Sequence, residues 1–327
     1  MVGSLPVGTW LYMNSEISLP ILIACIVIPF GFMAPLMKLA FGSEQLTVIA
    51  ANLRPIREFL AIPEQVRPTQ PVLLKSSGFS FENVSFSYNH SREVLHNVSF
   101  SAEPGKMTAI VGPSGSGKST IAKLMAGFWD AGKGIVRYGG VDLKQIPFDQ
   151  LMGEISYVAQ DNFLFDRSIR ENIRMGRPEA TDHEVEEAAK AANCHEFIMQ
   201  LPNGYDTPAG EAGDRLSGGE RQRITIARAM LKPSRAVILD EATAYADPQS
   251  EAQIQEAVGR LVQGKTLIVV AHRLSTIQNA DQILVVDKGY IAASGTQKEL
   301  LDSCPLYRRM WENHLGAQSQ GRNRKEE

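Results

Sequence analysis

The stretch GPSGSGKST, Gly112 to Thr120, decides the fold of this chain. It fits G-x-x-x-x-G-K-[ST], in which glycines let successive backbone N–H groups turn inward around a phosphate, with a lysine and a hydroxyl at the start of a helix. An apolar run typical of a strand, Met107 to Val111 (MTAIV), precedes it, and a helix-forming run, Thr120 to Ala126 (TIAKLMA), follows. The stretch therefore predicts a phosphate-binding loop between a strand and a helix.

Two further motifs follow in the chain. LSGGERQR, Leu216 to Arg223, predicts a helix that opens at its glycines, and a helix N-terminus with bare backbone suits an anion. AVILDE, Ala236 to Glu241, predicts a buried strand that ends in two acids. Asp240 suits Mg²⁺ because a hard cation prefers carboxylate oxygen. Glu241 suits a general base that polarises water. Together the three motifs indicate an ATPase.

The composition is that of an α/β protein with room for two domains. The chain has 327 residues, a formal net charge of −3 and a hydrophobic content of 44%. No basic excess calls for nucleic acid, so none is expected as a partner. The three cysteines, Cys25, Cys194 and Cys304, lack the paired spacing of a zinc site or a disulfide framework, which indicates a reducing compartment.

The N-terminal part is apolar enough for a membrane. Ile17 to Met37 contains no charged residue and has about the ~20 residues that a helix needs to cross the hydrocarbon core. Its prolines, Pro20, Pro29 and Pro35, would damage a buried helix of a soluble protein but are tolerated in a membrane bundle. A signal peptide is not indicated, because Glu16 stands where a basic region would be. We predict a membrane span.

The flanks of the span indicate its orientation. Basic residues follow it on the C-terminal side, which the positive-inside tendency assigns to the cytoplasm: Lys38, Arg54, Arg57 and Arg67. Met1 to Met13 resembles the outer tip of a preceding span, so we expect the sequence to begin inside a longer membrane domain. Phe41 to Arg57 is amphipathic at helical spacing and predicts that the span continues into the cytosol.

From about Phe79 to His314 the sequence resembles the ATP-binding domain of an ABC transporter. With the preceding helix it resembles the C-terminal part of an exporter-type half-transporter, and the resemblance covers nearly the full chain. It implies an α/β P-loop ABC ATPase domain with a helical subdomain, preceded by the C-terminal part of an all-α transmembrane domain. The expected divisions are a membrane remnant at 1–60 (span about 17–37, cytosolic extension about 38–60), a linker at 61–75, the ATP-binding domain at 76–315 and a disordered tail at 316–327.

The resemblance also implies the nucleotide site. Tyr88, at the end of a predicted strand from Phe81, would stack on adenine, which is worth roughly 1–3 kcal/mol. Lys118 would neutralise phosphate oxygens and Ser119 would bind Mg²⁺. The nucleotide-binding set is Tyr88, Gly112, Pro113, Ser114, Gly115, Ser116, Gly117, Lys118, Ser119 and Thr120.

Catalysis and metal binding follow the family motifs. Gln160, after the strand-like Ile155 to Ala159, matches a glutamine that reaches the metal or the attacking water. His272, in AHRLST, matches the histidine that contacts the γ-phosphate. The implied catalytic residues are Glu241, His272, Lys118 and Gln160, and the implied Mg²⁺ ligands are Ser119, Gln160 and Asp240.

Some residues are implied to act across a pair of domains. The signature residues Leu216, Ser217, Gly218, Gly219 and Glu220 would contact the γ-phosphate on a second nucleotide-binding domain. Asp247 matches an aspartate that crosses between subunits, although Tyr245 and Ala246 depart from the commoner pattern. The implied partners are that second domain in a homo- or heterodimer, further transmembrane helices and the lipid bilayer. The implied location is the plasma membrane, with bacterial inner membrane expected and the ATP-binding domain in the cytoplasm.

Other functions stay open at this point. A soluble ABC-superfamily ATPase of DNA repair or translation shares the loop and LSGGE, but such a protein has no reason for an apolar span. An inactive or regulatory fragment is a further alternative. The stretches LPVGTWLYMNSEISLP and DEATAYADPQSE resemble bacterial half-transporters of siderophore or metal-chelate traffic, some of which import. Export of lipid, peptide or drug is not excluded.

Overall fold

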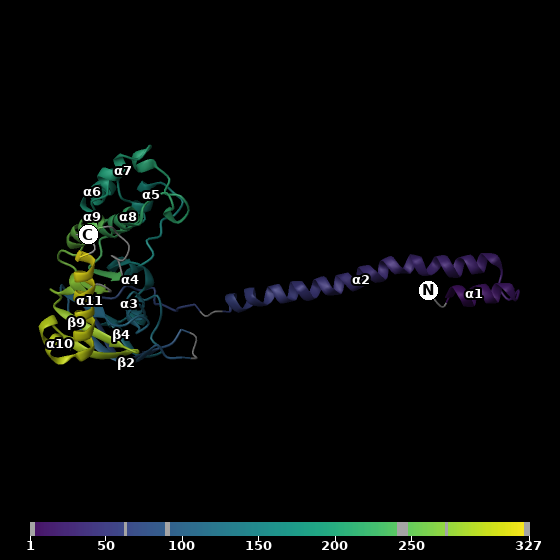
Figure 1. The fold of residues 1–327 in the computed structure, drawn as a ribbon, viewed down its shortest axis with the longest axis horizontal. Coiled ribbons are helices and arrows are strands. Elements are labelled where there is room, and N and C mark those ends of the chain that lie inside the picture. Colours follow the sequence, from purple (N-terminus) through teal and green to yellow (C-terminus); the bar gives the residue numbers. More distant parts are fainter. Residues whose placement is uncertain (1–3, 62–63, 89–91, 241–247, 272–273, 324–327) are drawn as a thin grey trace. The chain divides into compact units, whose positions relative to one another are not determined.

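The protein consists of two compact units, Met1–Gln65 and Val66–Glu327. The computed structural model describes residues 4–61, 64–88, 92–240, 248–271 and 274–323 (Figure 1). Glu241, Asp247 and His272 lie outside the described residues.

The first unit is a pair of helices, α1 (Ser4–Met13) and α2 (Leu19–Leu60). A Cβ atom at Gly8 would lie only 2.9 Å from Leu22 Cδ1, so glycine permits the close approach of the two helices. Pro20 stands in the first turn of α2, where its missing N–H leaves no hydrogen bond unmade.

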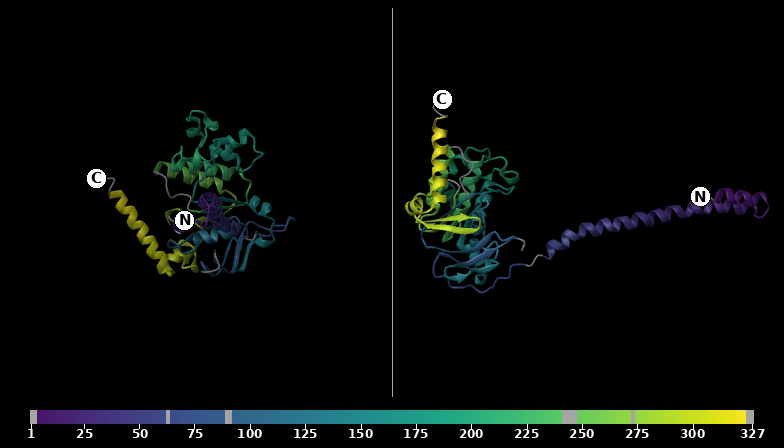
Figure 2. Two further views of the ribbon diagram at one scale, coloured as in Figure 1. Left: turned by 90° about the vertical axis from the view of Figure 1, so that its right-hand side faces the viewer. Right: turned by 60° about the horizontal axis from the view of Figure 1, so that its bottom comes forward.

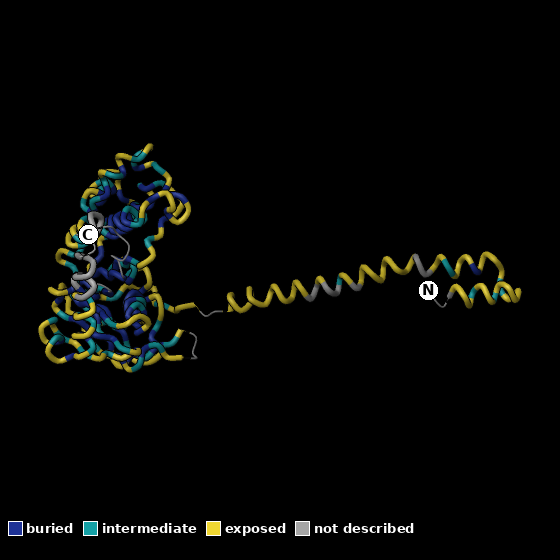
Figure 3. The backbone as a smooth tube through the Cα atoms, viewed as in Figure 1, coloured by how far each residue is buried: buried dark blue, intermediate teal, exposed yellow. Residues whose placement is uncertain are grey.

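The N-terminal half of α2 is long and apolar enough to span a membrane. Its segment Leu19–Leu39 has a mean hydropathy of 2.3, and only 6% of the apolar window is buried. Figure 3 colours most of this helix as exposed. Its exposed residues include large apolar ones such as Phe32 and Leu36. The same helix continues to Leu60 and so includes both the expected span and the expected cytosolic extension.

The second unit is built on a six-stranded sheet. Its strands, in spatial order, are β10 (Tyr290–Gly295), β9 (Gln282–Asp287), β3 (Met107–Val111), β8 (Thr266–Val270), β7 (Ala236–Asp240) and β6 (Ile155–Val158). All neighbours are parallel except β10, which is antiparallel to β9. Apolar strands such as AVILD are fully buried, as expected for a parallel sheet covered on both faces.

A second, antiparallel sheet covers one side of the first. Its order is β2 (Leu95–Ala102), β1 (Phe79–Phe86), β4 (Lys133–Tyr138) and β5 (Val141–Asp142). Phe81 and Val136 from this sheet share one core with Ile110 of β3 and with α3 (Lys118–Met125). The sequence predicts that Tyr88 ends the strand. In the structure β1 ends at Phe86, so Tyr88 lies beyond the strand.

A group of helices lies together (Figure 1), and its apolar side chains share a second core with Val158, Val237 and Leu267 of the large sheet. The group contains α5 (Ile169–Arg174), α6 (Asp182–Ala191), α7 (His195–Met199), α8 (Gly218–Leu231) and α9 (Pro248–Leu261). Short elements complete the unit: η1 (Leu143–Gln145), α4 (Phe148–Glu154), η2 (Gly204–Asp206), η3 (Glu211–Gly213), η4 (Leu274–Ile277) and α10 (Gln297–Ser303).

The ends of the ATP-binding region differ from the expected divisions. Helix α11 runs over Pro305–Asn323, into the segment predicted to be a disordered tail, and Tyr307 in its first turn is buried in a core. Figure 2 shows α11 extending away from the sheets. At the other end, residues 66–75 belong to the second unit, and Leu74 is buried in its core.

Candidate nucleotide-binding site

The loop Gly112–Gly117 connects β3 to α3 at the carboxyl edge of the large sheet. Gly112 has φ +153, and a Cβ atom there would lie 2.0 Å from the backbone oxygen of Val286, so only glycine fits. Gly117 caps α3 with φ 108. The loop borders a cleft of about 240 Å³ that is lined by Val94, Ser114, Gly115, Gly117, Lys118, Ser119 and Thr120.

The loop presents donors for a negatively charged ligand. Lys118 is buried in the first turn of α3, and its ammonium group donates to the carbonyl oxygens of Gly112 and Pro113, each at 3.0 Å. Ser116 is 3% exposed, and its hydroxyl has no hydrogen-bond partner among the described residues. Backbone N–H groups at a helix N-terminus and a nearby ammonium favour a phosphate.

Asp240 stands at the end of β7 and is 5% exposed. Both of its carboxylate oxygens accept hydrogen bonds from hydroxyl groups. Ser119 donates to Oδ1 at 3.1 Å, and Tyr157 of β6 donates to Oδ2 at 2.7 Å. Burial, followed by the Asp240 charge, raises the pKa of the Tyr157 phenol, which therefore remains protonated at neutral pH. The motifs in the sequence do not identify Tyr157, because its contact with Asp240 joins two different strands.

Gln160 lies just beyond β6, on the same edge as Asp240. Strands β6 and β7 are parallel, and Val158 pairs with Leu239, so their carboxyl ends meet. Gln160 is exposed there. This register places Gln160 and Asp240 at the same edge of the sheet.

An aromatic cluster surrounds Tyr88. The Tyr88 hydroxyl shares a hydrogen bond of 3.1 Å with the hydroxyl of Thr120 in α3. Trp129 meets the Tyr88 ring perpendicularly, with ring centroids 5.2 Å apart, and Phe86 meets it at 4.9 Å. Tyr88 is 39% exposed, so its ring remains available to a ligand. Sequence motifs give no signal for Trp129, which the fold brings to this cluster.

The signature segment starts a separate helix. Ser217 is the N-cap of α8 and forms a capping box with Glu220. The Ser217 hydroxyl donates to the Glu220 carboxylate at 2.9 Å and accepts from the Glu220 backbone N–H at 3.3 Å. Ser217 is exposed, whereas Gly219 is buried. In the described part of the chain, no hydrogen bond joins Leu216–Glu220 to the phosphate loop.

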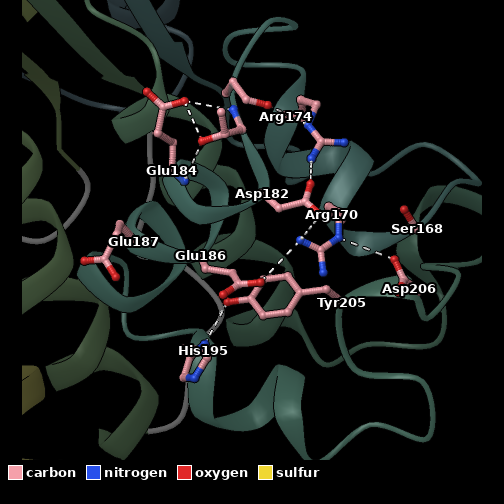
Figure 4. A network of polar contacts seen from close by, with 12 residues as sticks. Ser168, Arg170, Arg174, Asp182, Glu184, Glu186, Glu187, His195, Tyr205 and Asp206 are labelled. Atoms are coloured by element: carbon pink, nitrogen blue, oxygen red, sulfur yellow. Dashed lines mark hydrogen bonds and ion pairs between the residues drawn. The ribbon is translucent and has the colours of Figure 1, made fainter.

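A network of polar contacts connects helices α5, α6 and α7, which belong to the same helical group as α8 (Figure 4). Arg170 of α5 contacts carboxylates of Asp182 and Glu186 in α6 at 3.3 and 3.4 Å. Its guanidinium group also lies 5.0 Å from the ring centroid of Tyr205, whose hydroxyl bonds His195 Nδ1 at 2.8 Å. These contacts join α5, α6, α7 and η2 into one body.

Comparison with known proteins identifies this arrangement. The family profile described as ABC transporter matches residues 95–244. The chain is 40% identical, over 93% of its length, to the mycobactin import ATP-binding/permease protein IrtA of Mycolicibacterium smegmatis, of which it covers 37%. It is 47% identical, over 72% of its length, to the ATP-dependent lipid A-core flippase of Saccharophagus degradans, of which it covers 40%.

A solved structure has the same fold. The structure of a bacterial Atm1-family ABC exporter with ATP bound matches 91% of this chain with a TM-score of 0.76 and 36% identity, and 53% of that exporter chain is covered. The chain thus spans about 40% of the length of these two curated relatives. The predicted α/β ATPase fold with a helical subdomain after an all-α segment is confirmed. Residues 95–244 thus belong to a domain that matches the ABC transporter family, and the chain carries an ATP-binding domain of this type.

Proposed function

We propose that the chain is the ATP-hydrolysing part of an ABC transporter that moves a substrate across a membrane. Two observations favour a transporter over a soluble ATPase of DNA repair or translation. The segment Leu19–Leu39 has the length and hydropathy of a membrane span. The relatives with the same domain include a protein named as an ATP-binding/permease protein and one named as a flippase.

The hydrogen bond from Ser119 to Asp240 carries this proposal, because it puts a hydroxyl and a carboxylate together beside the phosphate loop. Hard oxygen groups of this kind suit Mg²⁺. We assign Ser119, Gln160 and Asp240 to the metal. Mg²⁺ held by these residues would neutralise negative charge on the phosphate groups.

The other site residues would bind the base, bind the phosphates and catalyse hydrolysis. Tyr88 would stack on adenine, and the loop from Gly112 to Thr120, with Lys118, would hold the phosphates. Glu241 would accept the proton of the attacking water as the oxygen–phosphorus bond forms. His272 and Gln160 would hold the γ-phosphate and the water in line for displacement of ADP.

A second nucleotide-binding domain would complete the site. Ser217 is exposed at the N-terminus of α8, where backbone N–H groups favour an anion. We propose that Leu216–Glu220 of one domain contacts the γ-phosphate held by the loop of the other, with Asp247 between the two. Further transmembrane helices in the lipid bilayer would form the substrate pathway.

The proposed location is the plasma membrane of a bacterium, the inner membrane where there are two, with the ATP-binding domain in the cytoplasm. A siderophore or another metal chelate is the proposed cargo. The support is the relative named for mycobactin import, which matches 93% of this chain.

The test is Mg²⁺-dependent ATPase activity of the chain against Glu241→Gln over a range of protein concentrations. Activity that rises with concentration and is lost in the variant supports a dimer that uses Glu241 as base. Glu187→Gln, an exposed acid of α6 paired with Lys190, is the control and should hydrolyse at the unmodified rate. Unchanged hydrolysis in Glu241→Gln would overturn the assignment of the base.

A further inference from the structure

The turn after α3 places three consecutive side chains against three separate parts of the ATP-binding domain. Phe128 meets the ring of Tyr157, with centroids 5.0 Å apart. Trp129 meets Tyr88 at 5.2 Å. Asp130 accepts two hydrogen bonds from Arg67 of the linker segment, at 2.7 and 3.2 Å. One short turn therefore contacts the base end of the site, the strand beside Asp240 and the linker.

The Arg67–Asp130 contact is the strongest kind of side-chain ion pair. Each terminal nitrogen of the guanidinium group donates to a different carboxylate oxygen, which is the two-pronged geometry that only arginine offers. The Arg67 side chain is 5% exposed and that of Asp130 is 30% exposed. Loss of either partner would leave the other charge poorly solvated.

A second contact fastens the same segment. The side-chain amide of Gln150 in α4 accepts from the backbone N–H of Val72 at 3.0 Å and donates to its carbonyl oxygen at 2.7 Å. Leu74 then enters the core beside β4. The segment from Val66 to Lys75 therefore contacts the domain at Arg67, Val72 and Leu74. In the chain it follows α2, which ends at Leu60.

The turn Phe128–Asp130 connects the Arg67 contact to Tyr88, the proposed binding site for the nucleotide base. Tyr88 is held at its hydroxyl by Thr120 and at its ring by Trp129. Trp129 is 44% exposed, so its position depends on the neighbours that fix the turn. Asp130 is the next residue, and a displaced Asp130 would move the Trp129 ring and weaken one of the two aromatic contacts to the Tyr88 ring, the other being with Phe86.

We propose that Arg67, through Asp130 and Trp129, is a positioning residue that sets the affinity of the Tyr88 site for a nucleotide base. Docking of the segment around Arg67 on the ATP-binding domain would then control the affinity of the nucleotide site. This inference rests on the proposed nucleotide function and adds a regulatory input to it.

The experiment uses the full chain with Trp10→Phe and Trp311→Phe, which leaves Trp129 as the single tryptophan. Binding of ATP and of inorganic triphosphate is measured with Mg²⁺ from Trp129 fluorescence and by calorimetry. Arg67→Gln should weaken ATP binding about three- to tenfold, the range expected for one aromatic contact. Triphosphate binding should change less than twofold, and Trp129 emission should shift to the red.

Three further variants separate positioning from general damage. Lys190→Gln breaks an exposed ion pair of α6 and should change neither ligand affinity. Arg67→Lys keeps the charge without the two-pronged contact and should lie between wild type and Arg67→Gln. Reversal of the pair, Arg67→Asp with Asp130→Arg, should restore part of the ATP affinity.

The outcomes distinguish this inference from the proposed function. An equal loss of ATP and triphosphate binding in Arg67→Gln, or no loss of either, would overturn the positioning role while the nucleotide function stands. A parent protein that binds neither ligand would overturn the nucleotide function and the inference with it.

Discussion

The hydroxyl of Tyr157 donates to Oδ2 of Asp240 at 2.7 Å, opposite the bond from Ser119 to Oδ1. The carboxylate is thus oriented by one residue of the phosphate-loop helix and one residue of the neighbouring strand. A phenol whose pKa is raised by burial is a lasting donor, so this orientation does not vary over the neutral pH range.

Tyr157→Phe should therefore weaken the proposed Mg²⁺ site. A hydrogen bond to a charged group contributes roughly 1.5–3 kcal/mol, and its loss frees the Asp240 carboxylate to rotate. We expect a higher Mg²⁺ concentration for half-maximal ATP binding, by about three- to tenfold, equivalent to less than about 1.4 kcal/mol. This concentration is measured by titrating Mg²⁺ at a fixed ATP concentration and monitoring ATP binding by calorimetry.

Tyr138→Phe is the matched control for that experiment. Tyr138, in strand β4 of the antiparallel sheet, is buried, and its hydroxyl donates to Oε2 of Glu154 in α4 at 3.2 Å. Both variants should lose some stability to heat, but Tyr138→Phe should keep the Mg²⁺ dependence of wild type. Equal Mg²⁺ dependence in the two variants would remove Tyr157 from the metal site.

Glu220→Gln should strengthen ATP-dependent pairing of two domains. The Glu220 carboxylate lies in the first turn of α8, where the proposed partner would bring a γ-phosphate, so two negative charges would meet. Glutamine preserves the capping box and removes the charge. We expect about two- to fivefold tighter pairing in a Glu241→Gln background, consistent with an exposed charge contact of under about 1 kcal/mol. Sedimentation with Mg²⁺ and ATP measures it.

Glu299→Gln makes the same change in a capping box elsewhere. The Thr296 backbone N–H donates to Glu299 at 2.8 Å at the start of α10, as the Ser217 N–H does to Glu220. This control should leave pairing unchanged. If both variants altered pairing alike, net charge rather than the position of Glu220 would be responsible.

The predictable part of this molecule is the part whose chemistry is local. The loop that ends in Lys118 and Ser119, the helix that opens at Gly218 and the strand that ends in Asp240 can each be recognised within ten residues, because the backbone conformation they need selects glycine or apolar residues. The α/β fold follows from their order along the chain.

The contacts that tune the site were not predictable, because they join residues far apart in the chain. Arg67 looks like a charged linker residue among prolines, and only the folded chain brings it to Asp130. Trp129 and Tyr157 belong to no motif, and each acquires its role from a neighbouring element. A related reason applies to α11, which continues beyond residue 316. The polar composition of that segment does not indicate that it extends a helix whose first turns are packed.

Glu184→Gln should make the stability of the helical group less sensitive to acid. The backbone N–H and hydroxyl of Thr181, and then Arg177, lower the Glu184 pKa below 4.5. A lowered folded-state pKa stabilises the fold above pH 4.5, and this contribution is lost as pH falls through the folded pKa. The variant should melt below wild type at pH 7 and approach it near pH 3. A gap that stays constant over this range would contradict the assignment.

Asn172→Ala should destabilise the segment that follows Gln160. Asn172 is fully buried, and its side chain accepts from the Phe165 backbone N–H and donates to the Phe165 carbonyl, both at 2.9 Å. Arg228 of α8 donates to the same side-chain oxygen at 3.0 Å. Truncation leaves these groups buried without partners, so we expect a loss of about 2–4 kcal/mol in the free energy of unfolding. Urea denaturation measures it.

The same variant tests whether Asn172 connects α8 to the segment 160–168, which begins at Gln160. Because Arg228 also donates to the backbone oxygen of Asn172 at 2.8 Å, α8 and the 160–168 segment share one buried anchor. Hydrogen exchange should therefore rise in both segments of Asn172→Ala. Asn193→Ala, which removes contacts to Gln253 and Glu256 nearer the surface, should cost about 1 kcal/mol and leave exchange of the 160–168 segment unchanged. If the two variants lost the same free energy of unfolding, the burial of Asn172 would not account for its contribution to stability.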